Sequence, residues 1–214
     1  MPMDSSVIFK YFSDLNDTQR AQFEALGELY ADWNSKINVV SRKDIDNLYV
    51  HHVLHSLAVG AFLGQLVPGT RIIDVGTGGG FPAVPLAILY PDTEFLLVDR
   101  IGKKLKVADE VAKAIGLTNT TSKHGDVAEV HDKFDYAVSR AVMRLDALVK
   151  LVRRNIASEC RNNHPNGLVC LKGGDLEEES KGVNYPVVEF PVNEFFSEDF
   201  FDTKKVIYVP MTKK

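Results

Sequence analysis

A cluster of glycines next to two acids is the part of the sequence with the clearest chemical meaning. Four glycines stand within the five positions from Gly76 to Gly80, directly after the apolar run RIIDV with its single acid, Asp74. The next apolar run, TEFLLVD, ends on a second acid, Asp99. Glycine costs backbone entropy on folding, and it is used where a chain turns sharply or approaches a ligand closely. The pattern therefore indicates a ligand site between two strand ends.

The residues after the glycines exclude two common phosphate-binding loops. A P-loop carries Lys-Ser or Lys-Thr after its last glycine, and here Phe81-Pro82 follows Gly80. A dinucleotide fingerprint needs a third glycine three positions after the second, and Phe81 occupies that place when the count starts at Gly76 and Gly78. A nicotinamide oxidoreductase is therefore disfavoured.

S-adenosylmethionine fits the pattern better, because it is a phosphate-free, cationic adenosine cofactor. Asp74 can face the positive part of such a ligand, and Asp99 can accept hydrogen bonds from both ribose hydroxyls. Gly76, Gly78 and Gly80 let the backbone run beside the ligand without a Cβ clash. A tight glycine turn that binds nothing is the alternative at this stage.

A third acid-bearing turn, KHGDVAEV, supports this interpretation. If it lies beside the adenine, Asp126 can accept from the adenine amino group, and the backbone amides of Val127 and Ala128 can bond the ring nitrogens. The alternative is a plain surface turn.

The chain around these turns alternates between apolar strand-like runs and helical runs. Before it, an amphipathic helix begins at Asn16 or Asp17 as N-cap, and a second helical pattern covers 44–66. Strands are expected at 71–75, 93–99, 120–126, 133–141 and 166–174, helices at 82–90, 102–117 and 144–156, and a closing strand pair at 187–190 and 204–209.

This alternation predicts an α/β fold with a doubly wound, mostly parallel, Rossmann-like sheet. Together with the expected S-adenosylmethionine site, such a sheet is of the class I methyltransferase type. The final strand pair predicts an antiparallel edge. We expect an N-terminal helical extension over 1–66, packed on a methyltransferase domain over 67–214. In such sheets ligands bind outside the carboxyl ends of the strands, which is where the glycine loop stands.

Composition permits a packed globular protein. The chain has 214 residues, 45% of them hydrophobic, and a net charge of −4. Between Arg140 and Lys172, seven Arg and Lys residues face two acids, Asp146 and Glu159, which gives a local charge of +5. A basic RNA-binding surface on an acidic protein is therefore possible, as is an ordinary solvated helix face.

Cysteines and histidines give no metal motif. Cys160 and Cys170 match no zinc spacing and are expected to be reduced thiols. His51 and His55 lie one helical turn apart, but no third ligand accompanies them, so no metal is expected. Neither a membrane span nor a signal peptide is evident, and a cytoplasmic location is expected.

Several segments together resemble one family. IIDVGTGGGFPAVPLAI, LLVDRIGKK, AVSRA and CLKGG occur in this order after INVVSRKDIDNLYVHHVLHSL. Over about residues 37–172 the chain is similar to the RsmG family, also called glucose-inhibited division protein B. The resemblance implies methylation of N7 of one guanine in 16S ribosomal RNA with S-adenosylmethionine. It places cofactor contacts on Gly76, Phe81, Val127, Ala128 and Arg140, to which Asp99 is added by its position.

Two positions depart from the family pattern. His55 stands where the family typically has aspartate, and Asp126 stands where an arginine is frequent. The second departure bears on the adenine-side assignments.

Guanine N7 carries a lone pair and no proton, so no general base is needed, and none is nominated. We expect Arg140 and Lys172 to be the catalytic pair, holding guanine O6 or a nearby phosphate. Asn38, His52, Ser56 and Lys103 are expected on the substrate side. The expected partner is 16S ribosomal RNA, either in the small subunit or in an assembly intermediate, and a monomer is expected. Another RNA, a small molecule or a protein as substrate is the alternative, followed by a non-enzymatic S-adenosylmethionine-binding factor.

Overall fold

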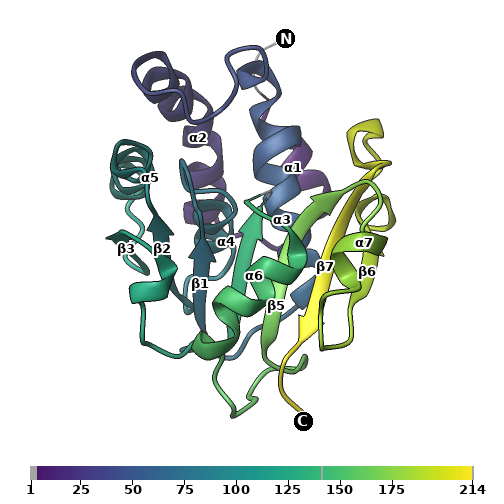
Figure 1. The fold of residues 1–214 in the computed structure, drawn as a ribbon. Coiled ribbons are helices and arrows are strands. Elements are labelled where there is room, and N and C mark those ends of the chain that lie inside the picture. The colour runs from purple at the N-terminus through teal and green to yellow at the C-terminus, as the bar shows by residue number, and fades with distance from the viewer. Residues whose placement is uncertain (1–3, 141, 214) are drawn as a thin grey trace.

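The computed structural model describes residues 4–140 and 142–213. Its centre is a seven-stranded sheet with the strand order β3-β2-β1-β4-β5-β7-β6 (Figure 1). The first five strands in the chain run parallel, and β7 is antiparallel to both β5 and β6. The doubly wound sheet and its antiparallel edge confirm the fold prediction.

The strands match the predicted segments closely. Their bounds are Arg71–Val75 (β1), Glu94–Asp99 (β2), Thr120–His124 (β3), Tyr136–Arg140 (β4), Gly167–Gly173 (β5), Val188–Pro191 (β6) and Lys204–Pro210 (β7). Ala141, which the AVSRA motif includes, lies outside the described residues. The strand order changes direction between β1 and β4, so the carboxyl ends of these two strands flank the switch point of the sheet.

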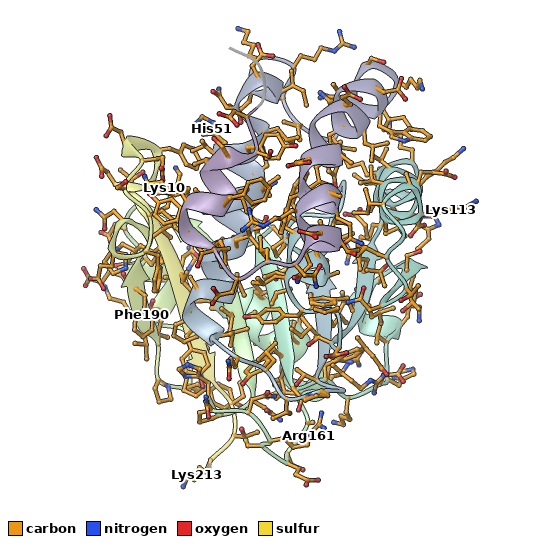
Figure 2. The ribbon with its side chains drawn as sticks, turned by 180° about the vertical axis from the view of Figure 1, so that it is seen from behind. Lys10, His51, Lys113, Arg161, Phe190 and Lys213 are labelled. Atoms are coloured by element: carbon orange, nitrogen blue, oxygen red, sulfur yellow. The ribbon has the colours of Figure 1, made fainter. Side chains whose placement is uncertain are left out.

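Helices cover both faces of this sheet. The α-helices are Ser6–Tyr11 (α1), Asp17–Lys36 (α2), His55–Leu63 (α3), Ala83–Leu89 (α4), Gly102–Ala114 (α5), Leu145–Val152 (α6) and Glu177–Ser180 (α7). Side chains of α1–α5 pack into one apolar cluster with one face of the sheet, and side chains of α6 pack into a second cluster on the other. Figure 1 shows α6 and α7 in front of the sheet, and Figure 2, seen from behind, shows α1 and α2 on the opposite face.

Helix α2 begins as the sequence predicts. The Asn16 side chain accepts from the Gln19 backbone amide at 2.9 Å, and the Gln19 side chain accepts from the Asn16 amide at 3.0 Å. This reciprocal capping box satisfies amide groups that have no partner within the helix.

The second predicted helix is not a regular α-helix. It consists of a 3-10 turn, Ile45–Asn47 (η1), a π-helix, Leu48–Leu54 (η2), and then α3. Apolar spacing detects a helix, but it does not resolve the wider π turn, whose hydrogen bonds span one more residue. The remaining 3-10 turns are Val127–Glu129 (η3), Arg153–Asn155 (η4), Val192–Glu194 (η5) and Asp199–Phe201 (η6).

The N-terminal helices contribute directly to the main core. Phe23 and Tyr30 of α2 and Leu57 of α3 are fully buried in the same cluster as Ile72 of β1. The proposed division of the chain at residue 66 stays a prediction. Among the described residues, no helix is both long enough and apolar enough to cross a membrane.

Candidate cofactor and substrate site

Asp74 is a buried carboxylate at the switch point. It lies near the end of β1 and is fully buried. Its Oδ2 accepts from the Ala83 amide at 3.0 Å, whereas Oδ1 is buried without a hydrogen-bond partner among the described residues. Burial raises the pKa of Asp74 to about 7, although the Thr77 hydroxyl, the Ala83 amide and Arg140 act in the opposite direction. The ionised form is therefore destabilised until a cation or a donor reaches it.

Asp99 ties the glycine loop to the end of β2. Its Oδ2 accepts from the Gly78 amide at 2.7 Å, and its Oδ1 accepts from the Ile101 amide at 2.7 Å. The Gly76 amide donates to the Val98 carbonyl at 2.9 Å. Each carboxylate oxygen has a second lone pair, so Asp99 can still accept from ribose hydroxyls while it holds the loop.

The glycines of the loop adopt left-handed backbone conformations. The φ angles of Gly76, Gly78 and Gly80 are +70°, +57° and +103°. A Cβ at Gly78 would meet no atom within 4 Å, so open space lies beside this residue. A Cβ at Gly80 would lie 2.6 Å from a Val84 methyl carbon and 3.1 Å from the Tyr30 hydroxyl. Gly78 therefore faces space for a ligand, and Gly80 is required by packing.

Replacing Gly80 with alanine is expected to destabilise the protein by about 2–4 kcal/mol, because backbone strain and overpacking add at this position. Gly116→Ala is a matched control: Gly116 also has a positive φ, +73°, but nothing lies within 4 Å of its added Cβ. Chemical denaturation measures both variants. Equal losses would show that the close packing around Gly80 contributes nothing.

The turn after β3 is built around Asp126. Its Oδ1 accepts from the Ala128 amide at 2.8 Å and caps η3, and its Oδ2 is paired with Arg100. The Ala128 amide, predicted to bond the adenine, thus already donates within the turn, and Val127 is buried. The Asp126–Arg100 pair still places an arginine at this turn, here supplied by the residue that follows β2.

Arg140 ends β4 on the same face of the sheet as Asp74. Its guanidinium carbon lies 5.0 Å from the centre of the Phe81 ring, a cation–π geometry. The His52 ring lies 5.6 Å from the same ring and the Tyr30 ring 4.7 Å from it. Burial lowers the pKa of Arg140 to about 10, so the guanidinium remains charged at neutral pH. The structure thus brings Asp74, Phe81, His52 and Arg140 together.

Lys172 does not join this group. Side chains alternate between the two faces along a strand. Lys172 therefore shares the sheet face of Cys170, which packs with α6. Arg140 instead shares the face of Val138, which packs with α1–α5. The Nζ of Lys172 donates to the Met143 carbonyl at 2.8 Å and to Glu179 Oε2 at 2.6 Å. In this structure Lys172 links β5 to α7 and to the segment before α6, and its catalytic role stays a prediction.

The other predicted substrate residues divide between surface and core. Asn38 and Lys103 are exposed. Ser56 is fully buried, and its hydroxyl donates to the His52 carbonyl at 2.6 Å. As placed here, Ser56 supports the helix rather than facing solvent.

The predicted basic segment is not one surface. Arg140 and Lys172 lie at the carboxyl ends of their strands, on opposite faces of the sheet. Arg161 lies at the far end of the molecule from His51 (Figure 2), where it donates to the Gly69 carbonyl at 2.8 Å. Sequence proximity alone had grouped charges that the fold separates.

Histidines and cysteines take structural positions. Asp44 accepts from His51 and His52, and burial together with Arg140 lowers the pKa of His55 to about 3. Cys170 is buried and Cys160 partly buried, and both are free thiols. Within residues 4–140 and 142–213, no group of three or more metal-ligating side chains is arranged to hold an ion.

Sequence reasoning missed Asp44, Thr77 and Tyr30 as components of the site. The Tyr30 hydroxyl donates to the Gly79 carbonyl at 2.8 Å and fixes the loop from α2. In the sequence, the spacing of Tyr30 on an amphipathic helix indicated only a buried position. Nothing in the sequence pattern distinguishes Asp44 from other loop acids.

The residues present fit an S-adenosylmethionine-type ligand. The unpartnered Oδ1 of Asp74 can receive a cationic group, the space beside Gly78 allows close approach of the ligand, and Asp99 lies at the adjacent strand end. Fold and site together define a methyltransferase of the Rossmann-like class I type.

Comparison with known proteins agrees with this class and narrows it. Residues 19–184 match the family model GidB, described as rRNA small subunit methyltransferase G. The chain is 56% identical over 202 residues to ribosomal RNA small subunit methyltransferase G of Bacteroides thetaiotaomicron, covering 94% of this chain and 98% of that one. For the protein of the same name from Porphyromonas gingivalis the identity is 51% over 211 residues, or 98% and 95% of the two chains. The chain belongs to the rRNA small subunit methyltransferase G family, as the sequence motifs predicted.

Solved structures agree on the fold. The CurJ carbon methyltransferase superposes with a TM-score of 0.58 at 14% identity, over 98% of this chain and 70% of that one. Precorrin-6y C5,15-methyltransferase from Geobacter metallireducens gives a TM-score of 0.52 at 14% identity, over 81% of this chain and 90% of that one.

Proposed function

We propose that the protein transfers a methyl group from S-adenosylmethionine to N7 of a guanine in 16S ribosomal RNA of the small subunit. The observation that carries the proposal is membership, over nearly the whole chain, in a family named for methylating small-subunit ribosomal RNA. The Asp74 carboxylate, whose Oδ1 has no partner among the described residues, and the open space beside Gly78 support the choice of methyl donor.

In this proposal, the loop and two acids hold the cofactor. Asp74 faces the cationic part and Asp99 the ribose. The loop from Gly76 to Gly80 approaches the cofactor at Gly78, where the structure leaves open space, and Gly76 and Gly80 keep the loop in its left-handed conformation. The turn of Asp126, Val127 and Ala128 borders the adenine. S-adenosylmethionine supplies an electrophilic methyl group on sulfur when it is bound.

The residues of the chain contribute by aligning the guanine with the methyl group and by electrostatic stabilisation. Guanine N7 has an in-plane lone pair and no proton, so no side chain needs to remove one. Arg140, held over Phe81 at the switch point, is placed to orient the base through O6 or a neighbouring phosphate. Asn38 and Lys103, both exposed, are proposed RNA contacts.

Labelled methyl transfer to isolated ribosomal subunits tests this function. The protein is incubated with methyl-labelled S-adenosylmethionine and small or large subunits from cells that lack the enzyme. We expect label in 16S ribosomal RNA of the small subunit. Label confined to large-subunit RNA or to protein would contradict the proposal.

The place of action follows from the proposed substrate. We propose that the protein acts in the cytoplasm, on the small subunit or on an assembly intermediate of it. We propose that it acts as a monomer, with Asp74, Asp99 and Arg140 of one chain forming the site. Sedimentation velocity with and without small subunits tests both the monomer and the complex.

A further inference from the structure

One carboxylate binds two consecutive histidines beside the candidate site. Asp44 Oδ1 lies 2.6 Å from His51 Nδ1, and Asp44 Oδ2 lies 2.7 Å from His52 Nε2. The two histidines belong to the π-helix η2, a wider turn that is frequent at functional sites. Figure 2 marks His51 on this part of the chain.

The protonation of this group is defined by its contacts. Burial would raise the pKa of Asp44, but hydrogen bonds from Asn47, His51 and His52 hold it below its usual value. Asp44 is therefore ionised at neutral pH and can only accept. Burial, with Arg140 nearby, lowers the pKa of His52 to about 4, so this imidazole is neutral. Its proton must then be on Nε2, and Nδ1 carries a lone pair.

The two histidines that Asp44 binds also lie close to the surroundings of Arg140. Arg140 Nη1 lies 3.4 Å from the carbonyl oxygen of His51, a long contact, and its guanidinium stacks on the Phe81 ring that His52 also approaches. Nδ1 of His52 is buried without a partner among the described residues. The charged and titratable groups that act on His52 are Asp44, His51 and Arg140. The His52 ring, with its buried acceptor, and the Arg140 guanidinium, with five donors and one long hydrogen bond among the described residues, thus both approach the Phe81 ring.

We propose that Asp44 is a positioning residue of the methyl-transfer site: it fixes the Nε2–H tautomer of His52 and, through His51, the carbonyl oxygen that accepts from Arg140. The inference rests on the proposed function. Asp44 itself touches neither substrate nor cofactor in this account. It acts through the His52 ring and through the His51 carbonyl, both of which it fixes on the π-helix.

Substitutions at Asp44 test this assignment. Asp44→Ala removes both hydrogen bonds. Asp44→Asn keeps the shape, but its amide oxygen can accept from only one histidine while its NH2 group donates to the other. At least one imidazole must then change tautomer. The exposed Asp46 lies two residues away, and Asp46→Asn is the matched control.

Three measurements are made on each folded variant: methyl transfer to small subunits, S-adenosylmethionine binding by calorimetry, and long-range proton–nitrogen spectra of the histidine rings. His52 signals are assigned with a His52→Gln variant. We expect the kcat of both Asp44 variants to fall about tenfold or more, while S-adenosylmethionine binds to them as tightly as to the wild type. In Asp44→Ala we also expect His52 to lose its fixed Nε2–H tautomer. Asp46→Asn is expected to behave as the wild type.

The outcomes separate the inference from the proposed function. Wild-type kcat in the Asp44 variants, or an unchanged His52 tautomer in Asp44→Ala, overturns the positioning role. If the wild-type protein transfers no label to small subunits, the proposed function fails instead. The ring spectra still decide whether Asp44 sets the tautomer of His52.

Discussion

Replacing Arg140 with alanine is expected to lower the kcat of methyl transfer about a hundredfold or more while the protein stays folded. Arg140 is the last residue of β4 at the switch point, its guanidinium lies over the Phe81 ring, and its charge acts on Asp74. Without it, the strand end loses the donor that we propose orients an acceptor oxygen of the base. We expect the fold to persist, because Arg140 lies at a strand end and makes one long hydrogen bond among the described residues.

Two further variants make the Arg140 test specific. Arg140→Lys keeps the charge but loses the planar fork, so we expect intermediate activity. Arg161→Ala removes an arginine at the opposite end of the sheet and is expected to leave kcat within about twofold, as surface changes away from a site usually do. Steady-state kinetics with small subunits measures all three. Full activity in Arg140→Ala would remove Arg140 from the site.

Replacing Asp74 with asparagine is expected to stabilise the ligand-free protein and to weaken cofactor binding. Because burial raises the pKa of the folded protein's Asp74 from 3.8 to about 7, the folded state binds more protons than the unfolded state between these values. Stability is therefore lost as pH rises from about 4 to about 7, by roughly 2–4 kcal/mol, and asparagine avoids this loss. The amide oxygen of asparagine can still accept from Ala83.

The measurement is denaturant unfolding of both proteins across this pH range, together with calorimetric binding of S-adenosylmethionine. We expect the variant to be more stable above about pH 7 and equal to wild type near pH 4. Its affinity for the cofactor is expected to fall about tenfold or more, because a cationic group loses its facing charge. A variant that is less stable at high pH and binds equally well would contradict this role for Asp74.

The sequence predicted those features that depend on local patterns. Alternating apolar runs located the strands to within a few residues, and glycines after Asp74 located the loop, because strand ends and tight turns have strict residue requirements. The N-cap of α2 was likewise predicted at Asn16 or Asp17, because residues with a side-chain acceptor are favoured there. Family motifs supplied Arg140 and Phe81, which the structure places in contact.

What the sequence did not predict depends on tertiary contacts. The actual partners of the two histidines spaced one helical turn apart could not be predicted: His51 pairs with Asp44, and His55 is buried. Lys172 and Arg140 both end strands, but strand alternation places them on opposite faces, and only the fold shows that Glu179 holds Lys172. The π-helix places His51 and His52 on one carboxylate, an arrangement that α-helical spacing does not suggest.

Identifying the methylated atom tests whether the protein methylates guanine N7. 16S ribosomal RNA labelled by the purified protein is digested to nucleosides and analysed by mass spectrometry against standards. We expect the label in 7-methylguanosine. Label in another nucleoside, or in guanosine methylated at a different atom, would contradict methylation at N7.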